Sequence, residues 1–191
     1  MGENLKKLFT VLMLVCLVGS GCGRKKTTIE SQDTGQSMKN FSMEFFGDSF
    51  KANLKGEAAE KQSSNNQASV TKPSLEIKSK NFIVEIKTGS KGTGDVFLDS
   101  ETQNVIRVVI TNDITIIQKN PDSLQVNFSA TCGRLTYFEK EQIVMMEESP
   151  VLKQGVNEYK ADKIVYNLNE NRLRFEGNVR IFFKKEAADN P

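Results

Sequence analysis

The sequence of 191 residues contains no histidine and no tryptophan, and it has only four prolines and three cysteines. The missing histidine removes the commonest general base and metal ligand, and with it any Ser-His-Asp or Cys-His catalytic arrangement. The few cysteines and prolines exclude a disulfide-stapled or low-complexity body. We therefore rank an enzyme behind a binding or structural protein, and we expect no cofactor.

An excess of charge of one sign is also missing. The chain has 26 Lys and Arg against 24 Asp and Glu, which gives a formal net charge of +2. A nucleic-acid-binding domain usually carries a clear basic excess, so we expect no nucleic-acid partner. The apolar fraction of 38% and the length instead indicate one soluble globular domain.

Residues 1–21 have the pattern of a secretory signal peptide. Two lysines precede an apolar run from Leu8 to Val18, and small residues follow it. The run is shorter than the roughly 20 residues that a membrane-spanning helix needs. The ending Gly21-Cys22 resembles the lipobox of bacterial lipoproteins, which implies that Cys22 is the first mature residue and carries a lipid anchor. An ordinary signal peptide followed by an incidental cysteine is the alternative.

The remaining cysteine is predicted to be structural. After removal of Cys16 with the signal peptide and lipidation of Cys22, Cys132 has no partner for an intramolecular disulfide. It lies in a segment of apolar pattern, which is typical of a small buried hydrophobic side chain.

Composition divides the rest of the chain into three parts. Residues 22–40 are rich in Lys, Thr, Ser, Gln and Gly, which predicts a flexible tether. Residues 41–185 carry the apolar side chains of the folded body, and residues 186–191 form a short polar tail.

The body has the period-two pattern of antiparallel strands. Apolar and polar side chains alternate over residues 163–168, 172–176 and 179–183, and short polar segments separate these stretches. The polar segments favour tight reversals. The pattern predicts strand, turn, strand, break and strand, each strand having one apolar face.

The strands also repeat. A shift of 29 residues superposes 132–152 on 161–181 without a gap and keeps the apolar register. Looser copies occupy 96–116, with a polar break at 112–113, and 50–77. Hairpin units that cannot bury their apolar faces alone must stack, and no amphipathic helix is expected beyond the signal peptide. Period two permits either a closed barrel or sandwich filled by side chains, or an open rolled stack with an apolar trough.

The segment from Tyr159 to Phe183, YKADKIVYNLNENRLRFEGNVRIFF, resembles the repeat of the OstA-like lipopolysaccharide-transport proteins, in which an "EGNV" step recurs. The segments 54–59 and 70–75 are similar to the opening of the LptC-type member, where a membrane anchor precedes a periplasmic β-domain. The resemblance implies an all-β fold, a twisted antiparallel β-jellyroll built of stacked hairpin repeats and open along one side.

The same resemblance implies a function. The chain is expected to bind acyl chains of lipopolysaccharide, or of a similar acylated lipid, in its trough and to pass them along a head-to-tail bridge. Implied partners are the other jellyroll proteins of the bridge, with an inner-membrane ABC transporter as a further candidate. The expected location is the periplasm, anchored to either the inner or the outer membrane. The alternative is a structural β-scaffold lipoprotein of the cell envelope that mediates protein contacts without carrying lipid.

Two groups of residues are candidate sites. The trough candidates are apolar in both copies of the 29-residue repeat, and simple core packing is the alternative for each of them: Val144, Met146, Ile164, Tyr166, Leu173 and Phe175. The second group forms the last predicted strand, which nothing downstream can pair with and which is a candidate partner edge: Asn178, Val179, Arg180, Ile181, Phe182 and Phe183. No catalytic residue follows from the resemblance, and the acidic residues lack the spacing of a metal site.

Overall fold

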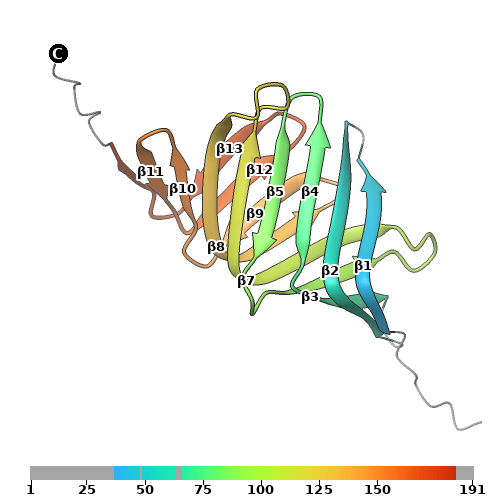
Figure 1. Ribbon diagram of the computed structural model, residues 1–191. Coiled ribbons are helices and arrows are strands. Elements are labelled where there is room, and N and C mark those ends of the chain that lie inside the picture. The colour runs from blue at the N-terminus through green and yellow to red at the C-terminus, as the bar shows by residue number, and fades with distance from the viewer. Residues whose placement is uncertain (1–36, 48, 63–65, 184–191) are drawn as a thin grey trace, which may run out of the picture. The chain divides into compact units, whose positions relative to one another are not determined.

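The computed structural model describes residues 37–47, 49–62 and 66–183. The chain divides into two units, of which the second, Gly35–Pro191, contains all the described residues. The predicted signal peptide, the predicted lipidation residue Cys22 and the predicted polar tail lie outside the described residues. Within the described part of the second unit there are fourteen β-strands and no helix that could span a membrane (Figure 1).

The first seven strands are β1 (Ser37–Phe46), β2 (Phe50–Gln62), β3 (Gln67–Thr71), β4 (Ser74–Ser79), β5 (Ile83–Thr88), β6 (Thr93–Leu98) and β7 (Val105–Lys119). The other seven are β8 (Val126–Phe138), β9 (Ile143–Glu147), β10 (Val151–Gln154), β11 (Asn157–Lys160), β12 (Lys163–Asn167), β13 (Arg172–Glu176) and β14 (Arg180–Phe182). All strand pairs are antiparallel and join into one sheet.

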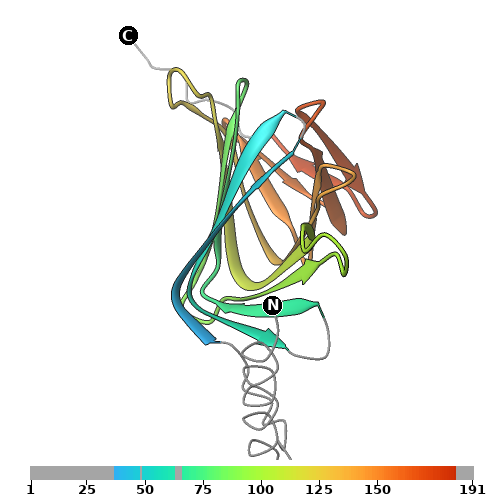
Figure 2. The ribbon, with the colours of Figure 1, turned by 90° about the vertical axis from the view of Figure 1, so that its right-hand side faces the viewer.

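Three long strands fold this sheet into two layers. The first half of β2 pairs with β4 and its second half with β3, β7 pairs first with β6 and then with β5, and β8 pairs first with β10 and then with β9. Layer A contains β3, β6, β9, β12 and β13, and layer B contains β4, β5, β10, β11 and β14. Each half of β2, β7 and β8 belongs to the layer of the short strands with which it pairs, and the end of β1 pairs with the first half of β2 in layer B. The layers meet at the bends of the long strands and diverge from them (Figure 2). This confirms the predicted twisted β-jellyroll that is open along one side.

The bend in β7 corrects one expectation. Residues 112–113 were expected to separate two strands, but β7 is continuous and its pairing with β8 shifts between Thr111 and Ile114. Asn112 and Asp113 both have a positive φ, at 70° and 51°. Asn and Asp tolerate the left-handed region, so the two residues form a bulge that bends the strand instead of ending it.

On β8 the bend requires a glycine. A Cβ atom at Gly133 would lie 2.8 Å from the Cβ atom of Glu148. The amide of Gly133 instead donates a hydrogen bond to the carbonyl of Glu148 at 3.0 Å. Glycine therefore permits the close approach of two backbone segments at the bend.

The strand register confirms the 29-residue repeat. In the first copy Leu135 pairs with Met146 and Tyr137 with Val144. In the second copy Ile164 pairs with Phe175 and Tyr166 with Leu173, in the same register. The copies stack directly, because β9 pairs with β12.

The last strand departs from the repeat. Residues 179, 181 and 183 were expected to continue an apolar inner face, but Ile181 is 46% exposed whereas its counterpart Leu152 is 0% exposed. The reason is position: β14 pairs with β11 at the end of the stack, and no further described unit covers it.

The folded body begins before residue 41. β1 starts at Ser37, which pairs with Glu60, so residues 37–40 belong to the sheet although their composition favours the tether. Pairing along β2 orders a segment whose own side chains bury little. Tertiary context overrides composition here.

Candidate lipid-binding interior and partner edge

The six trough candidates all lie on the inner face of layer A. Val144 and Met146 on β9 and Ile164 and Tyr166 on β12 are at most 1% exposed. The other two candidates, on β13, are partly buried and pack against the same apolar cluster. The structure therefore brings together all six predicted residues.

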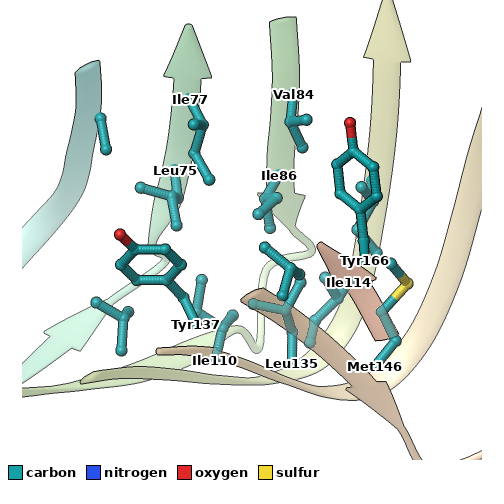
Figure 3. Packing of buried hydrophobic residues seen from close by; sticks show 14 of the residues in the cluster. Leu75, Ile77, Val84, Ile86, Ile110, Ile114, Leu135, Tyr137, Met146 and Tyr166 are labelled. Carbon is teal, nitrogen blue, oxygen red and sulfur yellow. The ribbon is translucent and has the colours of Figure 1, made fainter. Parts of the chain in front are cut away.

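Layer B supplies the opposite wall, which was not predicted as part of the site. Tyr137 and Tyr166 project from layer A toward fully buried aliphatic residues of β4 and β5 (Figure 3). These residues are Leu75, Ile77, Val84 and Ile86. Their alternation in sequence was visible, but alternation does not say which strands face each other across the interior.

Phenylalanines from layer B pack against each inner tyrosine. The ring centroid of Tyr137 lies 5.6 Å from that of Phe45 and 6.3 Å from that of Phe50. Tyr166 contacts Phe82 and Phe128, at 5.9 and 5.4 Å. Each ring pair joins residues distant in sequence, and alternation along a strand gives no sign of such contacts.

A cavity of about 430 Å³ lies on the open side. Its layer B wall is the end of β1, including Met43, Phe45 and Phe46. Its other wall comes from layer A, from the turn before β7 and from Glu139 after β8. The volume is within the range of about 300–1,000 Å³ that is typical of small-molecule pockets.

A hydrogen bond spans the open side near this end of β1. The hydroxyl of Ser49, in the turn between β1 and β2, donates to Oδ1 of Asn169 at 3.2 Å. Asn169 lies in the turn between β12 and β13, on the other layer. Both side chains are exposed, so this contact adds little stability on its own.

The two inner tyrosine hydroxyls differ in their hydrogen bonds. That of Tyr166 donates to Oδ1 of Asn171 at 2.5 Å. That of Tyr137 has no hydrogen-bond partner among the described residues. Burial raises the pKa of both phenols, and the charge of Glu139 raises that of Tyr137 further. Both groups are therefore neutral hydrogen-bond donors at physiological pH.

Cys132 is a buried side chain of the apolar cluster, as predicted. Burial raises the pKa of its thiol to about 12. The thiolate is the nucleophilic form, and at neutral pH it is almost absent. No group of metal-ligating side chains forms within the part of the chain that the structure describes.

The predicted partner edge lies at one end of the jellyroll. Three of its six residues form β14, which pairs with β11 on one side and with no described strand on the other. Phe182 and Phe183 are 47% and 76% exposed. Nζ of Lys160 lies 5.2 Å from the centroid of the Phe182 ring. The edge thus combines a free strand side with exposed apolar side chains.

The architecture defines the class of protein, an antiparallel β-jellyroll that is open along one side and apolar inside. A sequence model of the family described as LptA/(LptD N-terminal domain) LPS transport protein matches residues 67–172. This segment is more than half of the chain, and the chain belongs to this family of lipopolysaccharide-transport proteins.

A solved structure shares the fold. The crystal structure of LptH from Pseudomonas aeruginosa, described as the LptA homologous periplasmic component of the lipopolysaccharide transport device, matches with a TM-score of 0.52. The match covers 70% of this chain and 95% of that chain at 16% identity. A comparison with curated proteins gives no match.

Proposed function

We propose that the chain is a membrane-tethered periplasmic component of lipopolysaccharide export. In this proposal it holds lipid acyl chains between layers A and B and passes them to the next jellyroll of a head-to-tail bridge. The observation that carries the proposal is the pair of apolar inner faces, which meet on the bend side and reach a cavity on the open side, in a member of this transport family.

The energetics are consistent with cargo that enters by separating the layers. Each buried methylene contributes about 0.8 kcal/mol, so a chain of about ten methylenes contributes about 8 kcal/mol before costs. A hydrogen bond such as that between Ser49 and Asn169 contributes only about 0.5–1.5 kcal/mol. The larger cost is the contact between layers that the cargo must replace, and apolar cargo restores contacts of the same kind.

The scaffold alternative is favoured by one observation. The interior is filled by the chain's own side chains, as in an ordinary core. A lipid conduit and a scaffold therefore differ in whether the interior accepts a guest.

A photocrosslinking side chain at Phe175 tests this difference. Phe175 packs inward on β13, whereas its neighbour Arg174 points outward with 70% of its side chain exposed. In cells that make lipopolysaccharide, we expect light-dependent adducts with lipid from position 175 and at most a tenth as much from position 174. Immunoblots of the adducts with an antibody to the lipid measure both.

Positions 166 and 173 provide two further inward probes on the same wall. Failure of all three inward positions to capture lipid, in folded protein, would favour the scaffold.

We propose that the free side of β14 adds a strand from the next jellyroll, because exposed strand edges bind extended segments. Successive backbone N–H groups along a strand point to opposite edges. Arg180→Pro and Ile181→Pro therefore remove donors from opposite sides of β14.

We expect one of these two variants to lose crosslinking to its partner jellyroll while the midpoint of unfolding stays close to that of the native chain. The other should lower the midpoint, since it breaks the pairing with β11. Partner capture by in-cell crosslinking and denaturant unfolding measure the two effects. If both variants capture the partner as well as the native chain does, β14 is not the partner-binding edge.

A further inference from the structure

The Tyr137 hydroxyl is one of four side-chain polar atoms of the described residues that are buried without a hydrogen-bond partner. Tyr137 is 0% exposed, and its hydroxyl oxygen is buried without a hydrogen-bond partner among the described residues. Buried polar groups are nearly always hydrogen-bonded, because leaving one unpaired is costly. An exception at a candidate binding site suggests that a guest provides the partner.

The second inner tyrosine shows that the chain can satisfy such a group. Tyr166 occupies the corresponding place in the next repeat, and its hydroxyl is bonded to Asn171. The residue that corresponds to Asn171 after the shift of 29 is Gln142, whose Oε1 atom is itself buried with no partner in the described part of the chain. The internal bond of the second copy, between Tyr166 and Asn171, therefore has no counterpart between Tyr137 and Gln142 in the first copy.

Tyr137 also lies beside the open-side cavity. Phe45 packs against the Tyr137 ring and lines that cavity. Glu139, two residues after Tyr137, also lines the cavity. Tyr137 itself belongs to the buried apolar cluster. A guest whose hydrocarbon fills the interior would place the group that joins its chain to its head near this hydroxyl.

We propose that Tyr137 is a specificity-determining residue that donates a hydrogen bond to the carbonyl oxygen linking an acyl chain to its head group. The phenol is neutral and protonated, so it donates, and an ester or amide carbonyl accepts. This inference rests on the proposed lipid-binding function. It adds that the site distinguishes acyl chains joined through a carbonyl from alkyl chains that lack one.

The test compares two sugar amphiphiles with twelve-carbon chains. Sucrose monolaurate has an ester carbonyl at the head of its chain, and dodecyl maltoside has none. Binding of each is measured by calorimetry, below the critical micelle concentration, to the full chain carrying Cys22→Ser so that no attached lipid competes.

Tyr137→Phe should weaken binding of sucrose monolaurate about two- to tenfold, the effect of one hydrogen bond, and leave dodecyl maltoside unchanged. Its stability should not fall, because no internal hydrogen bond is lost. The matched variant Tyr166→Phe should lower stability, since it loses the bond to Asn171, and any change in its affinity should be the same for both amphiphiles.

The inference would be overturned if Tyr137→Phe and the native chain bound sucrose monolaurate with equal affinity. It would also be overturned if the variant lost affinity equally for both amphiphiles. In either case the lipid-binding function itself would stand. Binding of neither amphiphile by the native chain would instead contradict the proposed function.

Discussion

Replacing Cys22 with serine should release the protein from the membrane and abolish its labelling by radioactive palmitate. A single acyl chain gives only marginal membrane binding, so stable anchoring needs two or more chains, each methylene contributing about 0.8 kcal/mol. The chain has no strong basic charge to substitute for them, with a formal net charge of +2. We therefore expect a shift from mostly membrane-bound to mostly soluble protein on fractionation.

The neighbouring cysteine provides the control. Cys16 lies within the predicted signal peptide, so Cys16→Ser should leave both labelling and fractionation unchanged. Membrane retention of Cys22→Ser with undiminished labelling would contradict lipidation at this residue.

Linking the two layers across the open side should block uptake of acyl chains. Ser49 and Asn169 are in hydrogen-bond contact from opposite layers, so cysteines at these positions are close enough for a short thiol-cleavable crosslinker. In a chain whose native cysteines are replaced, we expect the linked protein to bind sucrose monolaurate at least a hundredfold more slowly than the unlinked protein. Cleavage of the linker should restore the rate, which stopped-flow measurements of binding would follow.

The bend side offers a matched control. The side chain of Asn178 donates to Asp162 at 2.8 Å on that side, where the layers already meet. Cysteines there, linked in the same way, should leave the rate unchanged. If the protein linked between positions 49 and 169 binds sucrose monolaurate as fast as the unlinked protein, acyl chains enter from the ends of the jellyroll.

Much of the candidate site could be predicted from the sequence. Because side chains of a strand alternate between its two faces, the apolar alternation identified Ile164 and Tyr166 as inward residues. The repeat also predicted the strand register, since Leu135 and Met146 pair as their counterparts Ile164 and Phe175 do. Both are local properties that depend on period two and on a fixed spacing.

Other features of the site depend on contacts between residues far apart in the sequence. Phe45 reaches Tyr137 across the interior, and Ser49 reaches Asn169 from the opposite layer. Period two says that a side chain faces inward, but it does not say which strand lies opposite or where the sheet bends.

The sequence alone determined the strand faces and the repeat of this protein, because both follow from local alternation and from a fixed spacing along the chain. Only the tertiary structure decided that β7 bends without breaking, that β14 is exposed, and that Tyr137 lacks the internal partner that Tyr166 has. Burial and hydrogen-bond satisfaction depend on what packs above and beside a residue, and in a stacked sheet those neighbours come from distant parts of the chain.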